Sequence, residues 1–146
     1  MAADLKIGFV NSEKVMREAV PAVRAQERLE KEFTKRDQEL KRMVRDLDAL
    51  KKELEGGKLS ETDRRNKIRA HDDLGRDLQR KQREFSEDFN QRRNEELASV
   101  LSKAEKTIIQ IAESEKYDLI LQDAVYYSKS IDITDKVVKA LSSDAK

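Results

Sequence analysis

Apolar residues in the first half of the chain follow a heptad pattern, which predicts a long helix with one buried stripe. Most steps between them are three or four residues, as along the seam of a coiled coil. Arg36 interrupts one of the two rows. The apolar positions are Leu29, Phe33, Leu40, Met43, Leu47, Leu50 and Leu54.

Two glycines and a capping signal near residues 55–63 predict the tip of a helical hairpin. Gly56 and Gly57 favour the end of the first helix, because glycine readily adopts the left-handed conformation that often follows a helix. Ser60 and Asp63 have the spacing of a capping box that begins the next helix.

A second apolar stripe follows this turn, so we expect the chain to fold back along itself. Folding about the tip places Phe85 near Phe33. The resulting antiparallel coiled-coil arm is expected to cover residues 22–111. Gly75 lies inside the returning helix, where glycine costs about 1 kcal/mol relative to alanine, and we therefore expect the arm to bend.

Three β-rich segments at the two ends of the chain predict one small mixed sheet, formed by residues 7–11, 117–122 and 125–128. We assign residues 1–21 and 112–146 to this β-rich body. A sheet of this size has exposed edges and too little apolar surface within one chain, so we expect self-association through the body. The predicted oligomerisation residues are Ile7, Phe9, Val10, Leu119, Ile120 and Leu121.

Two short helices are expected to flank the strands. One spans about 12–19 and should end before Pro21, because the residue preceding a proline is biased away from helical geometry. The other spans 134–141 and has Val137 and Leu141 on one face. The predicted fold class is therefore mainly α with a small β body.

The composition favours long solvated helices over a compact globule. Charged residues make up 42% of the 146 residues and hydrophobic residues 37%, whereas an ordinary domain has about 25% charged residues. The 31 basic and 30 acidic residues nearly cancel and are interleaved. Neither a disordered charged tail nor a basic nucleic-acid-binding face is expected from this pattern, so no nucleic-acid partner is predicted.

No cluster of residues predicts catalysis, a cofactor or a metal site, and we expect a protein that is not an enzyme. Cysteine is absent, and the four glycines form no phosphate-binding loop. The single histidine, His71, precedes Asp72 and Asp73; a solvated helix position is the stronger interpretation, and a metal ligand the weaker one. The residues alone leave both a cytosolic location and the removal of an export signal open.

The arm has two interpretations that the residues leave open. Its apolar side chains can form an ordinary coiled-coil seam, or some can face open space and contact other molecules. Its basic stretch from Arg64 to Arg83 can be a hydrated helix surface, or it can attract anionic lipid or acidic segments. The candidate contact residues are Phe33, Leu40, Met43, Leu47, Leu74, Phe85 and Phe89 for apolar partners, and Lys81, Arg92 and Arg93 for anionic lipid.

Three short motifs stand near the two ends of the chain, at residues 6–15 (KIGFVNSEKV), 117–122 (YDLILQ) and 130–137 (SIDITDKV). Together they resemble the Skp/OmpH family of periplasmic chaperones. The first motif is similar to the first strand and helix entry of that family, and the other two are similar to its closing strand and to the entry of its last helix. The order of elements also matches, so the resemblance covers essentially the whole chain.

This resemblance implies a jellyfish-like homotrimer that acts as an ATP-independent holdase. Such a chaperone encloses unfolded outer-membrane β-barrel proteins in the periplasm and prevents their aggregation, and it needs no cofactor. The resemblance also implies an export signal that has been removed, and weak contact with lipopolysaccharide through the three basic residues named above. The alternative is a coiled-coil structural or adaptor protein that binds a folded partner.

Overall fold

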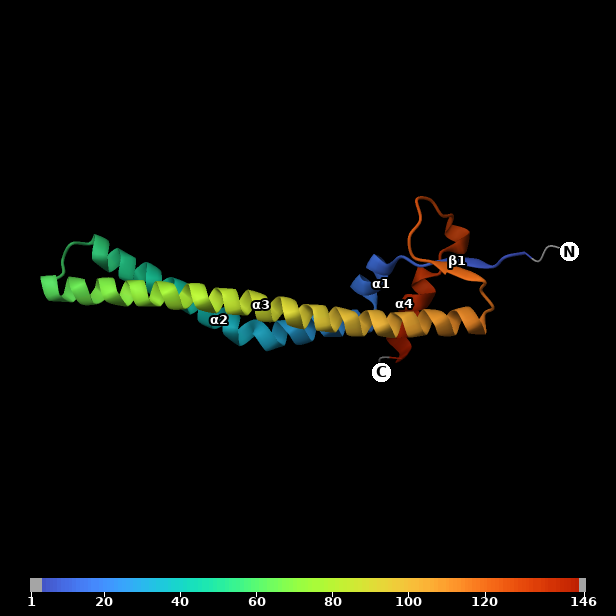
Figure 1. Cartoon of the computed structure of the whole chain (residues 1–146), viewed down its shortest axis with the longest axis horizontal. Coiled ribbons are helices and arrows are strands. Elements are labelled where there is room, and N and C mark those ends of the chain that lie inside the picture. Colours follow the sequence, from blue (N-terminus) through green and yellow to red (C-terminus); the bar gives the residue numbers. More distant parts are fainter. Residues whose placement is uncertain (1–3, 145–146) are drawn as a thin grey trace. The chain divides into compact units, whose positions relative to one another are not determined.

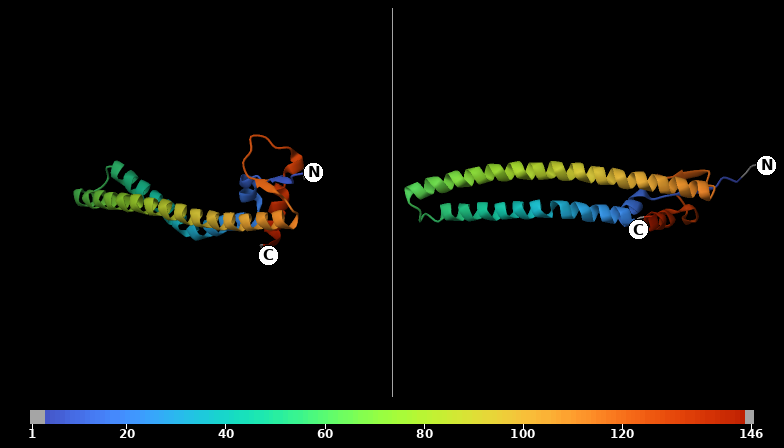
Figure 2. Two further views of the ribbon diagram at one scale, coloured as in Figure 1. Left: turned by 45° about the vertical axis from the view of Figure 1, so that its right-hand side comes forward. Right: turned by 90° about the horizontal axis from the view of Figure 1, so that it is seen from below.

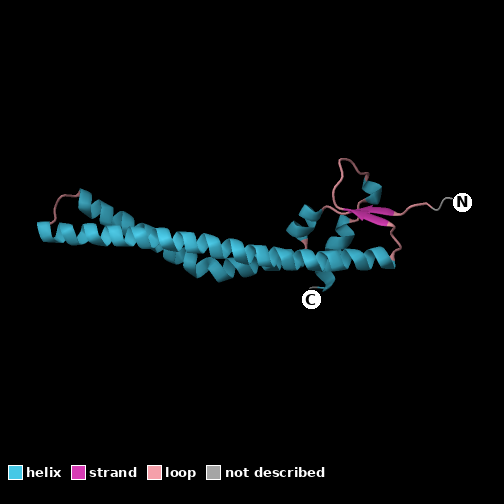
Figure 3. Cartoon of the chain, in the orientation of Figure 1, coloured by secondary structure: helices cyan, strands magenta, loops and turns pink. Residues whose placement is uncertain are grey.

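The computed structural model describes residues 4–144 and is mainly helical (Figures 1 and 3). The outermost residues of the predicted body, 1–3 and 145–146, lie outside the described residues. The elements in chain order are β1 (Ile7–Phe9), α1 (Ser12–Glu18), α2 (Val20–Glu55), α3 (Glu61–Ser114), β2 (Leu119–Leu121), the 3-10 helix η1 (Lys129–Ile131) and α4 (Thr134–Asp144).

The described residues form two compact units. The body unit contains the residues up to 28 and those from 93 onward, and the hairpin unit contains residues 29–92. The long helices α2 and α3 contribute to both units. The predicted fold class, mainly α with long helices and a small sheet, is confirmed.

The sheet of the body unit has two parallel strands. Its register pairs Ile7 with Leu119, Gly8 with Ile120 and Phe9 with Leu121, which joins the two ends of the chain as predicted. Glycine suits position 8, because a Cβ atom there would lie 3.1 Å from the Tyr117 ring.

The expected third strand at 125–128 is wrong, and the sheet is parallel rather than mixed. On the side of β1 away from β2, the structure has an isolated parallel bridge between Phe9 and Asp132. With that position taken, residues 125–128 have no strand partner within the described chain. Val125 instead lies fully exposed, and the Tyr127 ring stacks on Phe9 with a centroid distance of 3.6 Å.

The short helices begin and end at identifiable caps. The Asn11 side chain accepts a hydrogen bond from the Lys14 amide at 3.2 Å and so caps α1. The break before α2 falls at Ala19, whose extended backbone ends α1, one residue earlier than expected. Pro21 belongs to the first turn of α2, where its missing N–H leaves no helical hydrogen bond unmade.

The core of the body lies where α4 packs against α1 and the start of the sheet. Val10, Val15, Val137 and Leu141 are almost completely buried. The Thr134 hydroxyl is buried beside them and accepts a hydrogen bond from the backbone N–H of Asn11 at 2.9 Å. This bond ties the start of α4 to the chain between β1 and α1.

The hairpin unit consists of antiparallel stretches of α2 and α3 that lie side by side (Figure 2). At its tip Gly57 has a φ of 65°, and the Ser60 hydroxyl accepts a hydrogen bond from the Asp63 amide at 3.2 Å. The expected approach of Phe85 to Phe33 is confirmed by an edge-to-face contact with a centroid distance of 5.4 Å. α3 continues as a helix through Gly75.

Candidate functional site

The predicted oligomerisation residues divide between the interior of the body and its surface. Phe9 and Val10 are buried within the chain, and Ile7 and Ile120 are half-buried. Leu119 is 49% exposed and Leu121 is 36% exposed. Of these six residues, the two leucines therefore present the most apolar surface to a second molecule.

Backbone groups on the body are also open to pairing. β2 is hydrogen-bonded to β1 on one side, and no strand within residues 4–144 pairs with its other side. The nearby loop exposes Val125 and Tyr126, whose side chains make no part of the core. Edge strands with exposed apolar side chains are templates for pairing with another chain.

The seven apolar residues that were candidates for contact with other molecules all lie in the seam of the hairpin unit. Phe33 and Met43 are buried, and the other five are half-buried. Phe33 packs edge to face on both Phe85 and Phe89, with centroid distances of 5.4 and 5.2 Å. The three phenylalanine side chains therefore contact one another as long as the two helices stay packed together.

Other apolar side chains, which the heptad pattern did not single out as contact residues, are exposed on the helices. In the body unit these are Val23, Leu97, Leu101 and Ile109, and in the hairpin unit they are Val44 and Ile68. The signal that could have found some of them is the apolar doublet. Val100-Leu101 and Ile108-Ile109 each place two apolar residues side by side, and a helix that buries one of them turns the other toward solvent.

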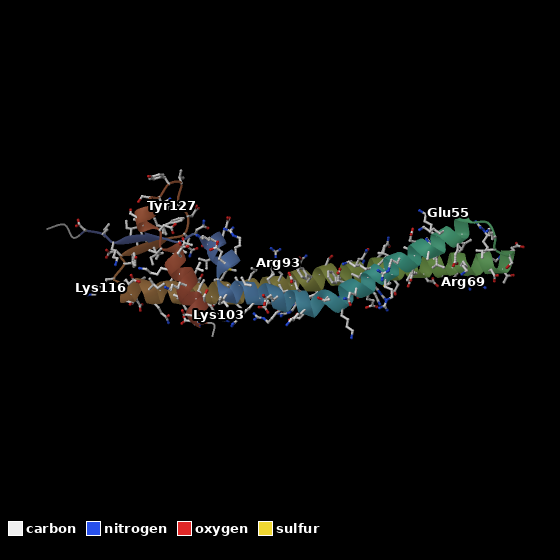
Figure 4. All side chains as sticks on the ribbon, turned by 180° about the vertical axis from the view of Figure 1, so that it is seen from behind. Glu55, Arg69, Arg93, Lys103, Lys116 and Tyr127 are labelled. Carbon is white, nitrogen blue, oxygen red and sulfur yellow. The ribbon has the colours of Figure 1, made fainter. Side chains whose placement is uncertain are left out.

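Two of the three bases expected to contact anionic lipid take part in ion pairs inside the hairpin unit. The Arg92 guanidinium donates to both carboxylate oxygens of Glu32, at 2.8 and 3.0 Å. The Lys81 ammonium lies 2.6 Å from Glu39. The hydrogen bond with Glu39 raises the pKa of Lys81, and the same bond lowers the pKa of Glu39. Arg93 is exposed (Figure 4).

The basic stretch from Arg64 to Arg83 is largely engaged with acceptors of the same unit. Arg64 donates to the backbone carbonyl of Leu54 at 3.0 Å. Lys67 pairs with a carboxylate on α2, as Lys81 does, and three arginines pair within α3. These contacts make the stretch a solvated, internally balanced surface.

Among residues 4–144, no three His, Asp or Glu side chains are grouped so that they could hold a metal ion. His71 Nδ1 lies 3.6 Å from the Asp72 carboxylate. Among the described helices, none combines the length and the apolar content needed to cross a membrane.

Comparisons with known proteins agree on the class of this fold. The family model described as outer membrane protein (OmpH-like) matches residues 6–141. A chaperone protein Skp from Photorhabdus laumondii is 31% identical over 142 residues, which cover 94% of this chain and 86% of that protein. An uncharacterized protein from Aquifex aeolicus is 30% identical over 139 residues, with the same coverage of both chains.

A solved structure supports the fold independently. The crystal structure of an OmpH-like outer membrane chaperone from Caulobacter crescentus has a TM-score of 0.79, with 18% sequence identity over 99% of this chain and 88% of the other. Long paired helices and a small sheet are thus a fold that this chain shares with that structure. The chain belongs to the Skp/OmpH family, whose members are periplasmic chaperones rather than enzymes.

Proposed function

We propose that this protein is an ATP-independent holdase of the periplasm that encloses unfolded outer-membrane β-barrel proteins and keeps them from aggregating. The observation that carries the proposal is the surface of the helices, where single apolar side chains stand exposed among interleaved charges. Val23, Leu97, Leu101 and Ile109 present such side chains in the body unit, and Val44 and Ile68 in the hairpin unit. Family membership supports the same function.

This surface suits a client that has no fixed shape. An unfolded β-barrel strand alternates apolar and polar residues, so it can contact scattered apolar side chains without a shaped pocket. Each contact is weak, but several arms acting together bind with high avidity while each contact reverses quickly. The half-buried Phe85 and Phe89 would add to this surface wherever the two helices separate. Release then needs no nucleotide.

Aggregation assays test the proposal directly. An outer-membrane β-barrel protein is diluted from urea with and without a small molar excess of this protein, and light scattering is followed. We expect scattering to be suppressed without ATP. A protein that leaves scattering unchanged, but binds one folded partner saturably, would instead be the structural adaptor that the sequence left as the alternative.

Self-association into a homotrimer is part of the proposal, and the body provides its surface. Leu119 and Leu121 are exposed on β2, whose outer edge is open to pairing. We expect Leu119→Asp combined with Leu121→Asp to shift the protein from trimer to monomer, because two carboxylates would be placed in an apolar contact. Light scattering coupled to gel filtration measures the mass.

The matched control for this variant is Val44→Asp combined with Ile68→Asp, which places the same two charges at exposed apolar positions of the hairpin unit. It should leave the mass unchanged. A trimer that persists in the Leu119 and Leu121 variant would show that assembly uses another surface.

We further propose that contact with lipopolysaccharide or anionic membranes is weak. Arg93 is exposed, whereas the charges of Lys81 and Arg92 are already opposed by Glu39 and Glu32. Ion pairs at this degree of exposure are screened by salt and contribute little. Lys81 and Arg92 can therefore exchange to an anionic lipid, but each exchange replaces one weak ion pair by another and gains little.

A further inference from the structure

The body unit contains a hollow of about 380 Å³ that is separate from the exposed edge of the sheet and from the seam of the hairpin unit. It lies where the first turns of α2, the body part of α3 and the end of α4 meet. Its volume falls within the range of small-ligand sites. The residues that line it are Pro21, Arg24, Arg28, Lys103, Lys106, Thr107, Gln110, Leu141 and Asp144.

The charged side chains that line this hollow are mainly basic, in contrast to the charge balance of the whole chain. Two arginines of α2 and two lysines of α3 line it, against one lining acid, Asp144. Glu96, outside the lining, also pairs with Arg28 at 2.8 Å. Lys103 and Lys106 are exposed, and within residues 4–144 neither takes part in an ion pair (Lys103 is labelled in Figure 4).

A buried threonine also lines the hollow. The Thr107 residue is only 6% exposed, yet its hydroxyl makes no hydrogen bond with any other described residue. Ser142, by comparison, donates to the carbonyl of Val138 in its own helix at 2.7 Å. Because Thr107 lines the hollow, we treat this hydroxyl group as a candidate donor to a ligand there.

We propose that this hollow binds a phosphate group. Ammonium and guanidinium groups act only as donors, and a hydroxyl group can add one more donor. A phosphate monoester carries a charge of about −1.5 to −2 near neutral pH and offers three acceptor oxygens, which matches several converging cations better than a single carboxylate does. Pro21 and Leu141 add an apolar surface that the non-phosphate part of the ligand can contact.

The phosphate group can come from a free phosphorylated molecule or from a lipid headgroup, because both present the same oxygens. The site does not depend on the proposed holdase activity. Binding of a phosphate ligand is measured without a client, so each proposal can fail while the other holds.

Two probes and two variants test the site on the full-length protein. Pyrophosphate binding is measured by isothermal titration calorimetry at constant ionic strength, and vesicles of phosphatidic acid in phosphatidylcholine are tested by flotation. In Lys103→Gln combined with Lys106→Gln we expect binding at least about tenfold weaker than in the natural chain. Thr107→Val, which keeps the shape and removes the hydroxyl, should weaken binding several-fold without changing the helical circular dichroism.

The matched control is Lys129→Gln combined with Lys139→Gln, which removes the same charge from exposed positions of the body outside the hollow. Its affinity should stay within about twofold of the natural chain. Pyrophosphate binding that only the Lys103 and Lys106 variant loses supports a free phosphorylated ligand, and the same pattern with vesicles alone supports a lipid headgroup. Equal loss in the control, no binding of either probe, or binding only of a Glu-rich peptide would each overturn the proposal.

Discussion

Replacing Val137 by aspartate is expected to unfold the body unit. The Val137 side chain is completely buried among Val10, Val15 and Leu141. The substitution removes an apolar side chain from this contact and places a carboxylate where the surrounding side chains are aliphatic. Changes of this kind lower the free energy of unfolding by about 4 kcal/mol or more, which is a large share of the stability of a small domain.

The tyrosines give a signal that is specific to the body. All three of them, Tyr117, Tyr126 and Tyr127, belong to this unit, and the chain has no tryptophan. Urea unfolding followed by tyrosine fluorescence therefore reports on the body, whereas helical circular dichroism mainly reports on α2 and α3. We expect the fluorescence midpoint of the Val137 variant to fall sharply, or the transition to be absent.

The control for this experiment is Val125→Asp, because the Val125 side chain is fully exposed. Val125→Asp makes the same chemical change in the same unit, and we expect it to leave the urea midpoint of tyrosine fluorescence unchanged. A Val137 variant with the natural midpoint would mean that the packing of α4 against α1 contributes little to the body.

Shortening the hairpin is expected to remove most of the holdase activity while leaving assembly intact. Deleting residues 41–54 and 62–75 together takes two heptads from each helix and retains the turn from Glu55 to Glu61. The heptad register is preserved, since Leu40 takes the place of Leu54. Each helix becomes about 21 Å shorter at 1.5 Å per residue.

The physical reason for the expected loss is that a holdase of this kind sums many weak contacts. Fewer exposed side chains and a smaller enclosed space lower the avidity steeply, so suppression of aggregation should require about tenfold more protein. The measurement is the light-scattering assay described above, with mass determination of the same sample.

Two outcomes would contradict this prediction in different ways. Full protection by the shortened protein would show that clients are held by the body unit. Loss of the oligomer would show that the distal hairpin takes part in assembly. The full-length variant Val44→Ser with Ile68→Ser is the control that removes the exposed apolar side chains without changing the length.

The helical part of the fold could be predicted because its signals are local. A heptad row such as Phe33, Leu40 and Leu47 indicates which face of a helix is apolar. The glycines at 56 and 57 and Ser60 indicate where one helix ends and the next begins. The contact between Phe33 and Phe85 follows from the position of the turn alone.

The sheet was predicted less well, because strand pairing is not local. Residues 125–128 are β-rich, but a strand exists only where another backbone accepts its hydrogen bonds. Asp132 bridges to Phe9 instead, and Tyr127 packs on the Phe9 ring.

The sequence by itself determined the helices, the turn and the family, since these depend on spacings of a few residues and on short terminal motifs. Only the tertiary structure decided which apolar side chains stay exposed, which bases meet an acid, and that Arg24, Lys103 and Leu141 line one hollow. The physical reason is the same in each case. Burial and charge pairing depend on contacts between residues far apart in the chain, and a helical pattern fixes the face of each side chain but not the neighbour that it meets.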